Sequence, residues 1–588
     1  APPMLIIYKL YHIQDRLFPP ATLGPWVDWT RVTRWLSHCD THHTAHCQLS
    51  PKSERLFGDF PRRLVDVERM CVVPFRSRQR YAALSYVWGV APTLRALRHN
   101  IHGLQQDGVL DFTPWMPYTL GDPVGQQTPL TIRHAMELTR HLGERFLWVD
   151  ALCIIQDDDA DRQHQLDRMG SIYANAYVTI VAAGGTALSG LRGIFGTTPT
   201  MERKADIPQH LTHYGMEKSL HGELIREHQR VKDSVWSQRG WTFQEQIFSR
   251  RLLILDNKSV TWECHCAVWL EGMEAVEKEC QDRGAVAAEG FAFSAEPNFG
   301  EYARHVTPYS RRQLTYPEDA LDAFAGILSV LRETAFKEGF ICGLPVRFFE
   351  AALLWYNKGQ LKKRQAKRQG GAPVVLPPSW AWAAWGGVVD YDNVDLGVEA
   401  GYREEGDKKL IRWRYDRPLV RWKYRASSDK DWTTVTSSFG CCLPSSDSAD
   451  PTSTTSSEND ANDTKGLPEE GTSTARGVTA TPNHSHLLLA YPLRAFFEVQ
   501  QAFGQVTAIL SNGSGGSAGS ITSGGQPVSK GQVCELVAVS ISSMNGEEAY
   551  DVLWIEWEGG IAYRKGVGRI RKAAWEAKNP ERVKLILG

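Results

Sequence analysis

The sequence predicts an α/β fold built on a parallel sheet, and the pattern between residues 81 and 185 supports this prediction. Three short apolar stretches, at 81–89, 145–150 and 177–185, have the length and composition of buried strands. The two segments between them, 131–143 and 157–176, carry apolar residues at helical spacing. Such alternation of strand and helix favours right-handed crossovers, which make consecutive strands parallel.

The first predicted strand, "YAALSYVWG", ends in Ser85, Tyr86 and Trp88, just before a glycine turn. The next segment, "TIRHAMELTRHLG", predicts a helix that stops at Gly143, a residue suited to a helix C-terminus. One face of that helix is apolar and consists of Ile132, Ala135, Met136, Thr139 and Leu142.

The second predicted strand, "RFLWVD", ends at Asp150. In parallel α/β sheets, ligands bind beyond the carboxyl ends of the strands. Asp150 is therefore a candidate ligand-binding or catalytic acid, level with Ser85, Tyr86 and Trp88 on the first strand. The alternative is that Asp150 only caps neighbouring loop amides, which also gives a buried carboxylate the partners it needs.

The segment "RGWTFQEQIFSRRLL" predicts a helix followed by another strand. On that helix Trp241 and Glu245 lie one turn apart, so the carboxylate is expected beside an aromatic surface. An apolar wall would raise the pKa of Glu245 and suit it to acid–base work. The alternative is that Trp241 is a core residue and that Glu245 pairs with Arg239 or Arg250.

Cys39, His43 and Cys47 recur at intervals of four residues in "CDTHHTAHC". On a helix they would line one side and, with a donor from elsewhere, could bind zinc. The spacing is not that of a standard zinc finger, and the alternative is a short helix with buried thiols. No metal is therefore assigned to the chain, and these three residues remain weak candidates.

The composition is that of an ordinary globular protein, 42% hydrophobic and 23% charged over 588 residues. A formal net charge of −1 gives no indication of nucleic-acid binding. The odd number of cysteines, 11, argues against a secreted disulfide framework. No apolar window is long enough to span a membrane. These features predict a soluble cytoplasmic protein.

Four blocks of the sequence resemble, in order, the signature blocks of the fungal heterokaryon-incompatibility (HET) domain family. They are "YAALSYVWG", "RFLWVDALCIIQDD", "MGSIYANAYVTIVAA" and "RGWTFQEQIFSRRLL". The resemblance implies a role in non-self recognition that ends in programmed cell death. HET domains have also been likened to TIR domains, which implies a flavodoxin-like parallel core. Some TIR domains cleave NAD with a cleft glutamate.

By that analogy Glu245 is the first candidate for the catalytic acid and Asp150 the second. Trp88, Trp241 or Tyr86 would stack the base near Ser85, and Arg239 would meet a phosphate. NAD would be a substrate, and no cofactor is expected. The alternative is a non-catalytic module that acts by self-association or by binding a protein partner. No P-loop, no GxGxxG after a strand and no HExxH motif supports catalysis.

The remaining organisation follows from composition. Near the C-terminus, "DVLWIEWEGGIAYRKG" predicts a hairpin with its turn at Gly559-Gly560, within a Trp-rich, β-rich accessory region. Two stretches lack the apolar residues of a core and are expected to be disordered. The predicted segments are an N-terminal helical segment (1–75), the HET-like α/β domain (76–266), the beginning of the C-terminal accessory region (267–443), a disordered insertion (444–482), an accessory strand segment (483–510), a Gly/Ser disordered insertion (511–529) and the end of the accessory region, with a hairpin and terminal helix (530–588).

Overall fold

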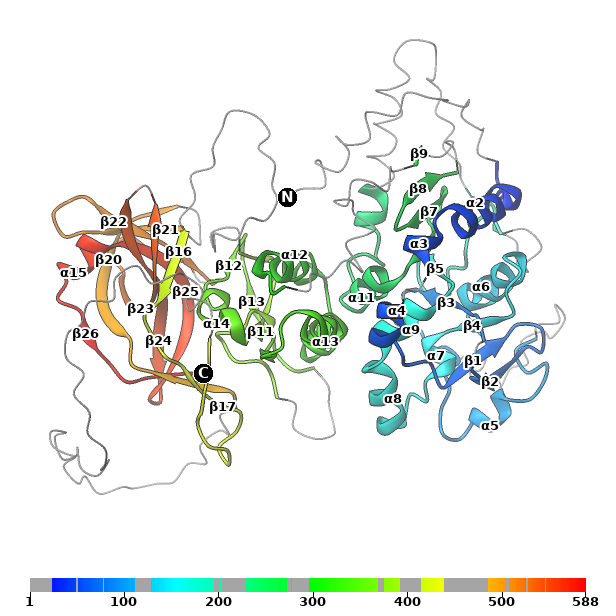
Figure 1. The fold of residues 1–588 in the computed structure, drawn as a ribbon, viewed down its shortest axis with the longest axis horizontal. Coiled ribbons are helices and arrows are strands. Elements are labelled where there is room, and N and C mark those ends of the chain that lie inside the picture. The colour runs from blue at the N-terminus through cyan, green and yellow to red at the C-terminus, as the bar shows by residue number, and fades with distance from the viewer. Residues whose placement is uncertain are drawn as a thin grey trace, which may run out of the picture. The chain divides into compact units, whose positions relative to one another are not determined.

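The computed structural model of the chain describes residues 24–48, 51–77, 79–111, 128–194, 201–203, 229–271, 276–277, 296–367, 375–391, 414–437, 485–503, 507–524, 527–544 and 546–588 (Figure 1). The predicted insertion at 444–482 lies outside these ranges. Two compact units divide the chain. The first is Ala1–Gly343, Asn357–Leu376 and Trp382–Tyr391, and the second is Leu344–Tyr356, Pro377–Ala381 and Asp392–Gly588.

The first unit is built on a nine-stranded sheet with the order β2-β1-β4-β3-β5-β6-β7-β8-β9. Its strands are β1 (Arg63–Asp66), β2 (Cys71–Pro74), β3 (Ala82–Ser85), β4 (Phe146–Trp148), β5 (Val178–Ala182), β6 (Arg251–Leu255), β7 (Val260–Cys264), β8 (Ala267–Leu270) and β9 (Val276–Glu277). The sheet thus begins before residue 76 and continues past residue 266, so it is wider than the predicted 76–266 domain.

Helices and short strands complete this unit. The helices are α2 (Trp29–His42), α3 (Thr44–Cys47), α4 (Pro51–Leu56), α5 (Ile101–Leu104), α6 (Leu130–His141), α7 (Asp150–Cys153), α8 (Asp159–Leu166), α9 (Met169–Asn175), α11 (Trp241–Phe248), α12 (Phe299–Ser310) and α13 (Ala325–Thr334). The 3₁₀ turns are η3 (Pro317–Ala320), η4 (Asp322–Phe324) and η6 (Trp382–Ala384). The short strands are β10 (Phe340–Ile341), β13 (Lys362–Lys363), β14 (Trp385–Gly386) and β15 (Val389–Asp390). Another two-residue strand, β12 (Tyr356–Asn357), lies where the two units meet in sequence.

The four central strands, β4-β3-β5-β6, are parallel, as predicted. The flanking strands are antiparallel, so the sheet is mixed and the prediction of a parallel sheet holds only for its centre. A short turn explains the change at β7. Asp256 accepts hydrogen bonds from the amides of Lys258 and Ser259 at 2.7 and 2.6 Å, and so tight a turn can only join antiparallel strands.

The centre of the sheet is the core of this unit. All residues of β5 and β6 are buried, as expected of parallel strands covered on both faces. Figure 1 shows α6 beside β3 and β4, and these elements are in contact. The predicted helix at 131–143 is confirmed as α6, and Gly143 follows it with φ of 75°. The second predicted strand is shorter than expected, because β4 stops at Trp148 and Asp150 begins α7.

The second unit contains a twelve-stranded sheet. The sheet consists of β16 to β27, and the elements of the whole unit are β11 (Leu344–Pro345), η5 (Val346–Phe348), α14 (Phe349–Ala352), β16 (Arg414–Pro418), β17 (Lys423–Arg425), β18 (Thr433–Thr434), β19 (Leu487–Ala490), β20 (Leu493–Phe503), β21 (Thr507–Ser511), β22 (Ser517–Ser523), β23 (Val533–Met544), β24 (Glu547–Glu558), β25 (Ile561–Arg571), α15 (Lys572–Glu576), β26 (Glu581–Arg582) and β27 (Leu585–Leu587). The predicted hairpin is confirmed as β24 and β25, with Gly559 and Gly560 at φ of 59° and 81°.

Six of these strands close into a ring, in the order β23-β20-β21-β22-β25-β24 and back to β23. The side chains inside the ring form one apolar core, which also contains Trp575 of α15. The chain does not end in the predicted terminal helix. Helix α15 spans only Lys572–Glu576, and β26 and β27 follow it.

The Gly/Ser-rich segment at 511–529 differs most from the sequence-based expectation. A stretch of it forms β22, which pairs with β21 on one side and β25 on the other. Glycine is what the pairing needs. A Cβ atom on Gly568 of β25 would lie 2.4 Å from the carbonyl oxygen of Ser520, so the two backbones approach at a distance that a side chain would prevent. The Gly/Ser-rich composition, which predicted a flexible insertion, here allows two strands to pair closely.

Candidate functional site

A cluster of polar side chains lies at the carboxyl ends of the central strands. Its central residue is Ser85, the last residue of β3. Its hydroxyl donates to the carboxylate of Glu245 on α11 and accepts from the indole Nε1 of Trp236 at 2.6 Å. Ser85 and Trp236 are fully buried, and Glu245 is 7% exposed. Ser85 therefore orients the Glu245 carboxylate from inside the core.

Local sequence explains why Glu245 faces the sheet. Gly240 precedes α11 and packs against Leu314, where a Cβ atom would lie 2.4 Å from that side chain. The amide of Gly240 also donates to the carbonyl of Gln313 at 2.7 Å. The start of α11 is thus held closely against the chain near residue 313, and one turn later Glu245 comes to the end of β3.

The second carboxylate, Asp150, has both oxygens occupied. Its Oδ2 accepts from the indole of Trp88 at 2.7 Å, and its Oδ1 accepts from the amide of Ala151 at 2.6 Å. The hydroxyl of Tyr86 lies close enough to lower the pKa of Asp150. The Arg95 guanidinium covers the Trp88 ring at 4.6 Å. The Asp150 side chain is thus bonded to the start of its own helix, α7, and to Trp88 beyond the end of β3.

Burial is the main reason that both acids hold protons more tightly than usual. It raises the pKa of Glu245 to about 7, against the opposing effect of the Ser85 hydrogen bond. The charge of Asp150 raises the Glu245 pKa further, whereas that of Arg239 lowers it. Burial likewise raises the pKa of Asp150 to about 6, against the hydrogen bonds from Trp88 and Ala151. Near neutral pH each acid can therefore exchange a proton.

Arg239 is half-buried and close enough to lower the pKa of both acids. Within the described ranges, its guanidinium forms no hydrogen bond or ion pair with another side chain. Arg250, the other predicted partner of Glu245, instead donates to the carbonyls of Ala174, Ala176 and Cys47. An unpaired guanidinium beside two acids is suited to binding an anionic group.

Trp241 lies at the start of α11, and its indole donates to Asp319 of η3 at 3.3 Å. It is half-buried, so some of the ring stays exposed. A neighbouring cation, Arg312, donates to Thr242 at 2.9 Å and to Gln246 at 2.8 Å. These contacts fasten α11 to the chain beyond the predicted domain end at residue 266.

The structure brings Ser85, Tyr86, Trp88, Asp150 and Glu245 together, with Arg239 near both acids. Sequence reasoning missed two residues of the group, Trp236 and Tyr173. The Tyr173 hydroxyl donates to the carbonyl of Leu84 at 3.1 Å and lies within hydrogen-bonding range of Glu245. Both stand within or next to the quoted sequence blocks, but nothing in their spacing links them to Ser85.

The weak metal candidates Cys39, His43 and Cys47 also lie close together. All three are buried, and Cys264 at the end of β7 joins them. These four Cys and His residues form a cluster that shares no residue with the one around Ser85 and Glu245. No helix in the described portion of the chain has the length and apolar content needed to cross a membrane.

Comparison with known proteins finds one family match that contains Ser85, Asp150 and Glu245. Residues 81–245 match the family described as Heterokaryon incompatibility protein (HET). Over 113 residues the chain is 32% identical to Heterokaryon incompatibility protein 6, OR allele, of Neurospora crassa. That stretch covers 19% of this chain and 15% of the relative, so the similarity is local. No solved structure matches the chain.

Proposed function

We propose that this chain acts in heterokaryon incompatibility, the response that follows fusion of genetically different fungal cells. One observation carries the proposal. The segment that matches the incompatibility family, residues 81–245, contains both Ser85 and Glu245, which meet in the buried polar group. The similarity to the Neurospora crassa protein supports the same role. The expected outcome of activation is growth arrest and cell death.

Expression of the full chain in a filamentous fungus tests this role. We expect the wild-type chain to arrest growth when its recognition is triggered by fusion with an incompatible strain. We expect Ser85→Ala to weaken the response, because it frees Glu245 and Trp236 from their shared partner. Fusion without any growth defect, across strains of differing genotype and with the protein present, would contradict the role.

For the chemistry, the proposed reaction is hydrolysis of the glycosidic bond of NAD or a related nucleotide. The bond between the ribose and the nicotinamide nitrogen breaks, its electron pair leaves with the nicotinamide, and water adds to the ribose carbon. A carboxylate at Glu245 would stabilise the positive charge that develops on the sugar. Asp150 would assist proton transfer, and Arg239 would bind a phosphate.

Strand order supports this assignment. Counted along the chain, the parallel strands β3, β4, β5 and β6 have the spatial order 2-1-3-4, which is that of flavodoxin-type sheets. The order reverses between β3 and β5, and the ends of strands at such a point are where ligands bind. Ser85 ends β3 at that place. A TIR-like core would have this arrangement.

A specific observation favours a second candidate, a non-catalytic module. Glu245 is only 7% exposed, and both carboxylate oxygens of Asp150 accept hydrogen bonds from within the protein. Acids with a purely structural role have such environments. The chain would then act by self-association or by binding a protein partner. Fold alone does not distinguish the two candidates.

Nicotinamide release from NAD distinguishes them. The purified full chain would be assayed alone and under conditions that induce oligomers, with Glu245→Gln compared with the exposed-site control Glu333→Gln. Catalysis predicts release by wild type and control and a loss of at least about a hundredfold in Glu245→Gln, within the range attributed to one acid–base group. No release under any condition supports the non-catalytic module. Equal release by all three proteins would exclude Glu245 as the catalytic acid.

A further inference from the structure

Four buried side chains with nitrogen or sulfur donors converge between α2, α3 and β7 of the first unit. They are Cys39 of α2, His43 between α2 and α3, Cys47 at the end of α3 and Cys264 at the end of β7. All their donor atoms lie within 4.8 Å of one another. The sequence shows the first three at regular spacing, but only the fold brings Cys264 to them, from more than two hundred residues away.

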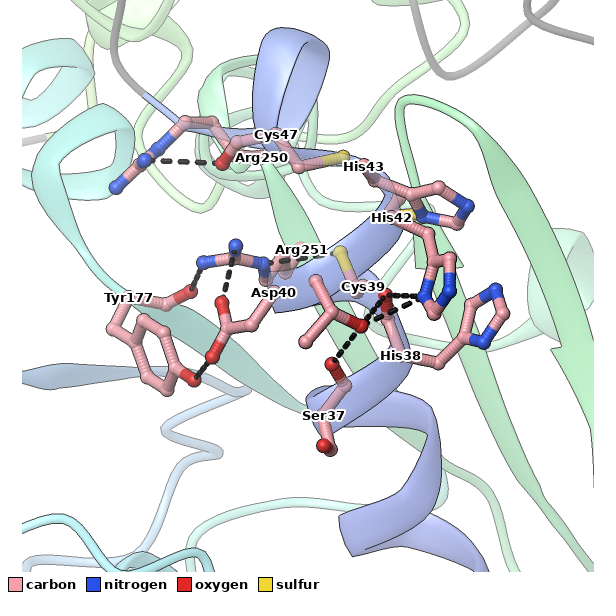
Figure 2. A network of polar contacts seen from close by, with 12 residues as sticks. Ser37, His38, Cys39, Asp40, His42, His43, Cys47, Tyr177, Arg250 and Arg251 are labelled. Carbon is pink, nitrogen blue, oxygen red and sulfur yellow. Dashed lines mark hydrogen bonds and ion pairs between the residues drawn. The ribbon is translucent and has the colours of Figure 1, made fainter.

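A break in the helix arranges the three N-terminal donors. Helix α2 ends at His42, and α3 begins at Thr44, so His43 lies at the junction with φ of −108° and ψ of 19°. Its amide still bonds to the carbonyl of Cys39, and the amide of Cys47 bonds to the carbonyl of His43. The three side chains therefore follow one another on the same side of the two helices, as Figure 2 shows.

The separations suit a tetrahedral metal ion. Zinc–sulfur bonds of about 2.3 Å and zinc–nitrogen bonds of about 2.0 Å put neighbouring ligand atoms roughly 3.5–3.8 Å apart. His43 Nδ1 and Cys264 Sγ are already 3.5 Å apart. The widest pair, at 4.8 Å, needs to close by only about 1 Å.

The positive charges around the four donor residues also favour a metal site with thiolate ligands. Arg251 is 2% exposed, and its Nε donates to the sulfur of Cys39 at 3.2 Å. Its other end pairs with Asp40 at 2.8 Å. Arg250, also buried, donates to the carbonyl of Cys47 (Figure 2). Two buried guanidinium groups thus lie beside the thiols, and in the described structure Asp40 is the one carboxylate paired with them.

Neighbouring histidines serve other contacts. His38 and His42 stack on each other at 4.1 Å toward the surface, and His42 Nδ1 is bonded to Thr41. His265 is bonded to the carbonyl of His46 at 2.8 Å. Among the described residues, the set whose donor atoms meet is therefore three cysteines and one histidine. An ordinary apolar core would not place an imidazole and a guanidinium against buried sulfurs.

We propose that Cys39, His43, Cys47 and Cys264 bind one zinc ion in a closed structural site that fastens α2 and α3 to β7. Three thiolates and a neutral imidazole leave a Zn²⁺ centre with one net negative charge. Arg251 beside Cys39 balances that charge, as hydrogen-bond donors around thiolate sites do. Soft sulfur donors and four protein ligands fit zinc without a position for water, so the site has no catalytic role.

Binding releases the three thiol protons to solvent, and no oxidant or reductant takes part. The site also accounts for the architecture. Without it, the segment carrying α2 and α3 is tied to the sheet by the buried face of α2, including Trp35 against Trp269 of β8, and by side-chain hydrogen bonds and ion pairs. With it, the helical segment before the sheet and an antiparallel strand within the sheet share one metal centre. This inference does not depend on the proposed incompatibility function.

Metal analysis of the full chain tests the proposal. The protein would be expressed in zinc-supplemented medium, purified without chelators and dialysed extensively. We expect one equivalent of zinc in wild type and less than about a tenth of an equivalent in Cys264→Ser. The matched control is Cys266→Ser, a buried cysteine two residues further along that lies outside the four-donor set; it should retain the full equivalent. Wild-type protein without zinc would overturn the proposal, as would equal zinc loss in the control.

A second measurement covers the case in which Cys264→Ser fails to fold. X-ray absorption at the zinc edge of wild-type protein should give three sulfur ligands and one nitrogen. Cobalt substituted into the site should show the visible bands of tetrahedral thiolate coordination. A first shell of oxygen and nitrogen only would overturn the assignment, and so would a disulfide between two of the three cysteines in the freshly purified chain.

Discussion

The hydroxyl of Ser85 and the carboxylate of Glu245 form a buried hydrogen bond between residues 160 positions apart. The bond joins the end of β3 to α11, and Trp236 completes it by donating to the same hydroxyl. Ser85 satisfies an indole and a carboxylate at once. The stability of the strand end and the protonation of Glu245 are therefore linked through a single side chain.

Replacing Ser85 should show this link. In Ser85→Ala the Trp236 indole and one Glu245 oxygen lose their partner, and leaving buried polar groups unsatisfied costs about 1–3 kcal/mol. The Ser85 bond also lowers the Glu245 pKa, so its loss should raise that pKa above its present value of about 7. We expect a lower apparent melting temperature, measured by calorimetry at pH 7. The exposed-site control Ser37→Ala should melt like wild type, and equal melting of Ser85→Ala would contradict the link.

The raised pKa of Glu245 has a consequence for stability. Its pKa is about 7 in the folded chain, against an ordinary value near 4.5. Folding therefore favours the protonated acid. The resulting stabilisation is fully present below about pH 4.5 and is lost as the pH rises through about 7. Between pH 4.5 and 8 the free energy of unfolding of wild type should fall by about 2–3 kcal/mol more than that of Glu245→Gln, because the glutamine cannot ionise.

Hydrogen exchange of α11 amides across this pH range measures the effect locally, so unfolding of the other unit does not interfere. Glu333→Gln provides the control, because Glu333 is exposed on α13 and its replacement should leave the pH dependence unchanged. If Glu245→Gln and wild type lose protection equally between pH 4.5 and 8, the carboxyl is ionised throughout that range and the prediction is wrong.

Much of the central fold was predictable because it depends on short-range patterns. The apolar runs of β3 and β5 and the amphipathic pattern of α6 appear directly in the sequence, and their alternation indicates parallel pairing. The antiparallel flanks were not predicted. They depend on turns such as that at Asp256 and on strands before residue 76, where the sequence pattern is weak.

The candidate site was only partly predictable, for a similar reason. Ser85 was found because it ends a strand and Asp150 because it closely follows one, and sequence patterns reveal both positions. Trp236 and Tyr173 reach Ser85 and Glu245 through the tertiary fold, which no local spacing encodes. Cys264 could not be predicted either, because it approaches Cys39 only when the tertiary fold packs β7 against α2.

A buried ion pair near the end of the sheet gives a third prediction. Arg203 and Glu271 are both buried, and Arg203 also donates to the carbonyls of Gly24 and Trp26. Glu271 accepts from the amide of Asp28 at 3.0 Å. In Glu271→Ala the Arg203 charge stays buried without its partner, which typically costs about 3–5 kcal/mol.

We expect Glu271→Ala to lower the melting temperature of the first unit and to increase proteolytic cleavage near residues 24–28. The control is Glu68→Ala, since Glu68 is mostly exposed beside Arg145 and surface ion pairs contribute about 0–1 kcal/mol. Similar cleavage of the two variants would show that Arg203 and Glu271 do not anchor this segment.

The close pairing of β22 with β25 gives the last prediction. A Cβ atom on Gly566 or Gly568 would lie 2.4 Å from the carbonyl oxygen of Thr522 or Ser520, respectively. These oxygens belong to the backbone of the paired strand and cannot move aside as a flexible side chain would. Gly568→Ala should therefore separate β22 from β25 and destabilise the closed ring by about 1–3 kcal/mol.

Hydrogen exchange of the β22 and β25 amides measures this separation directly, since their hydrogen bonds hold the pair together. The control is Gly103→Ala in α5, where an added Cβ meets nothing within 4 Å and alanine favours the helix. Faster exchange in Gly568→Ala alone is the expected result. Unchanged exchange would mean that β22 does not need its glycine-lined contact. The Gly/Ser-rich segment would then be the flexible insertion that its composition suggests.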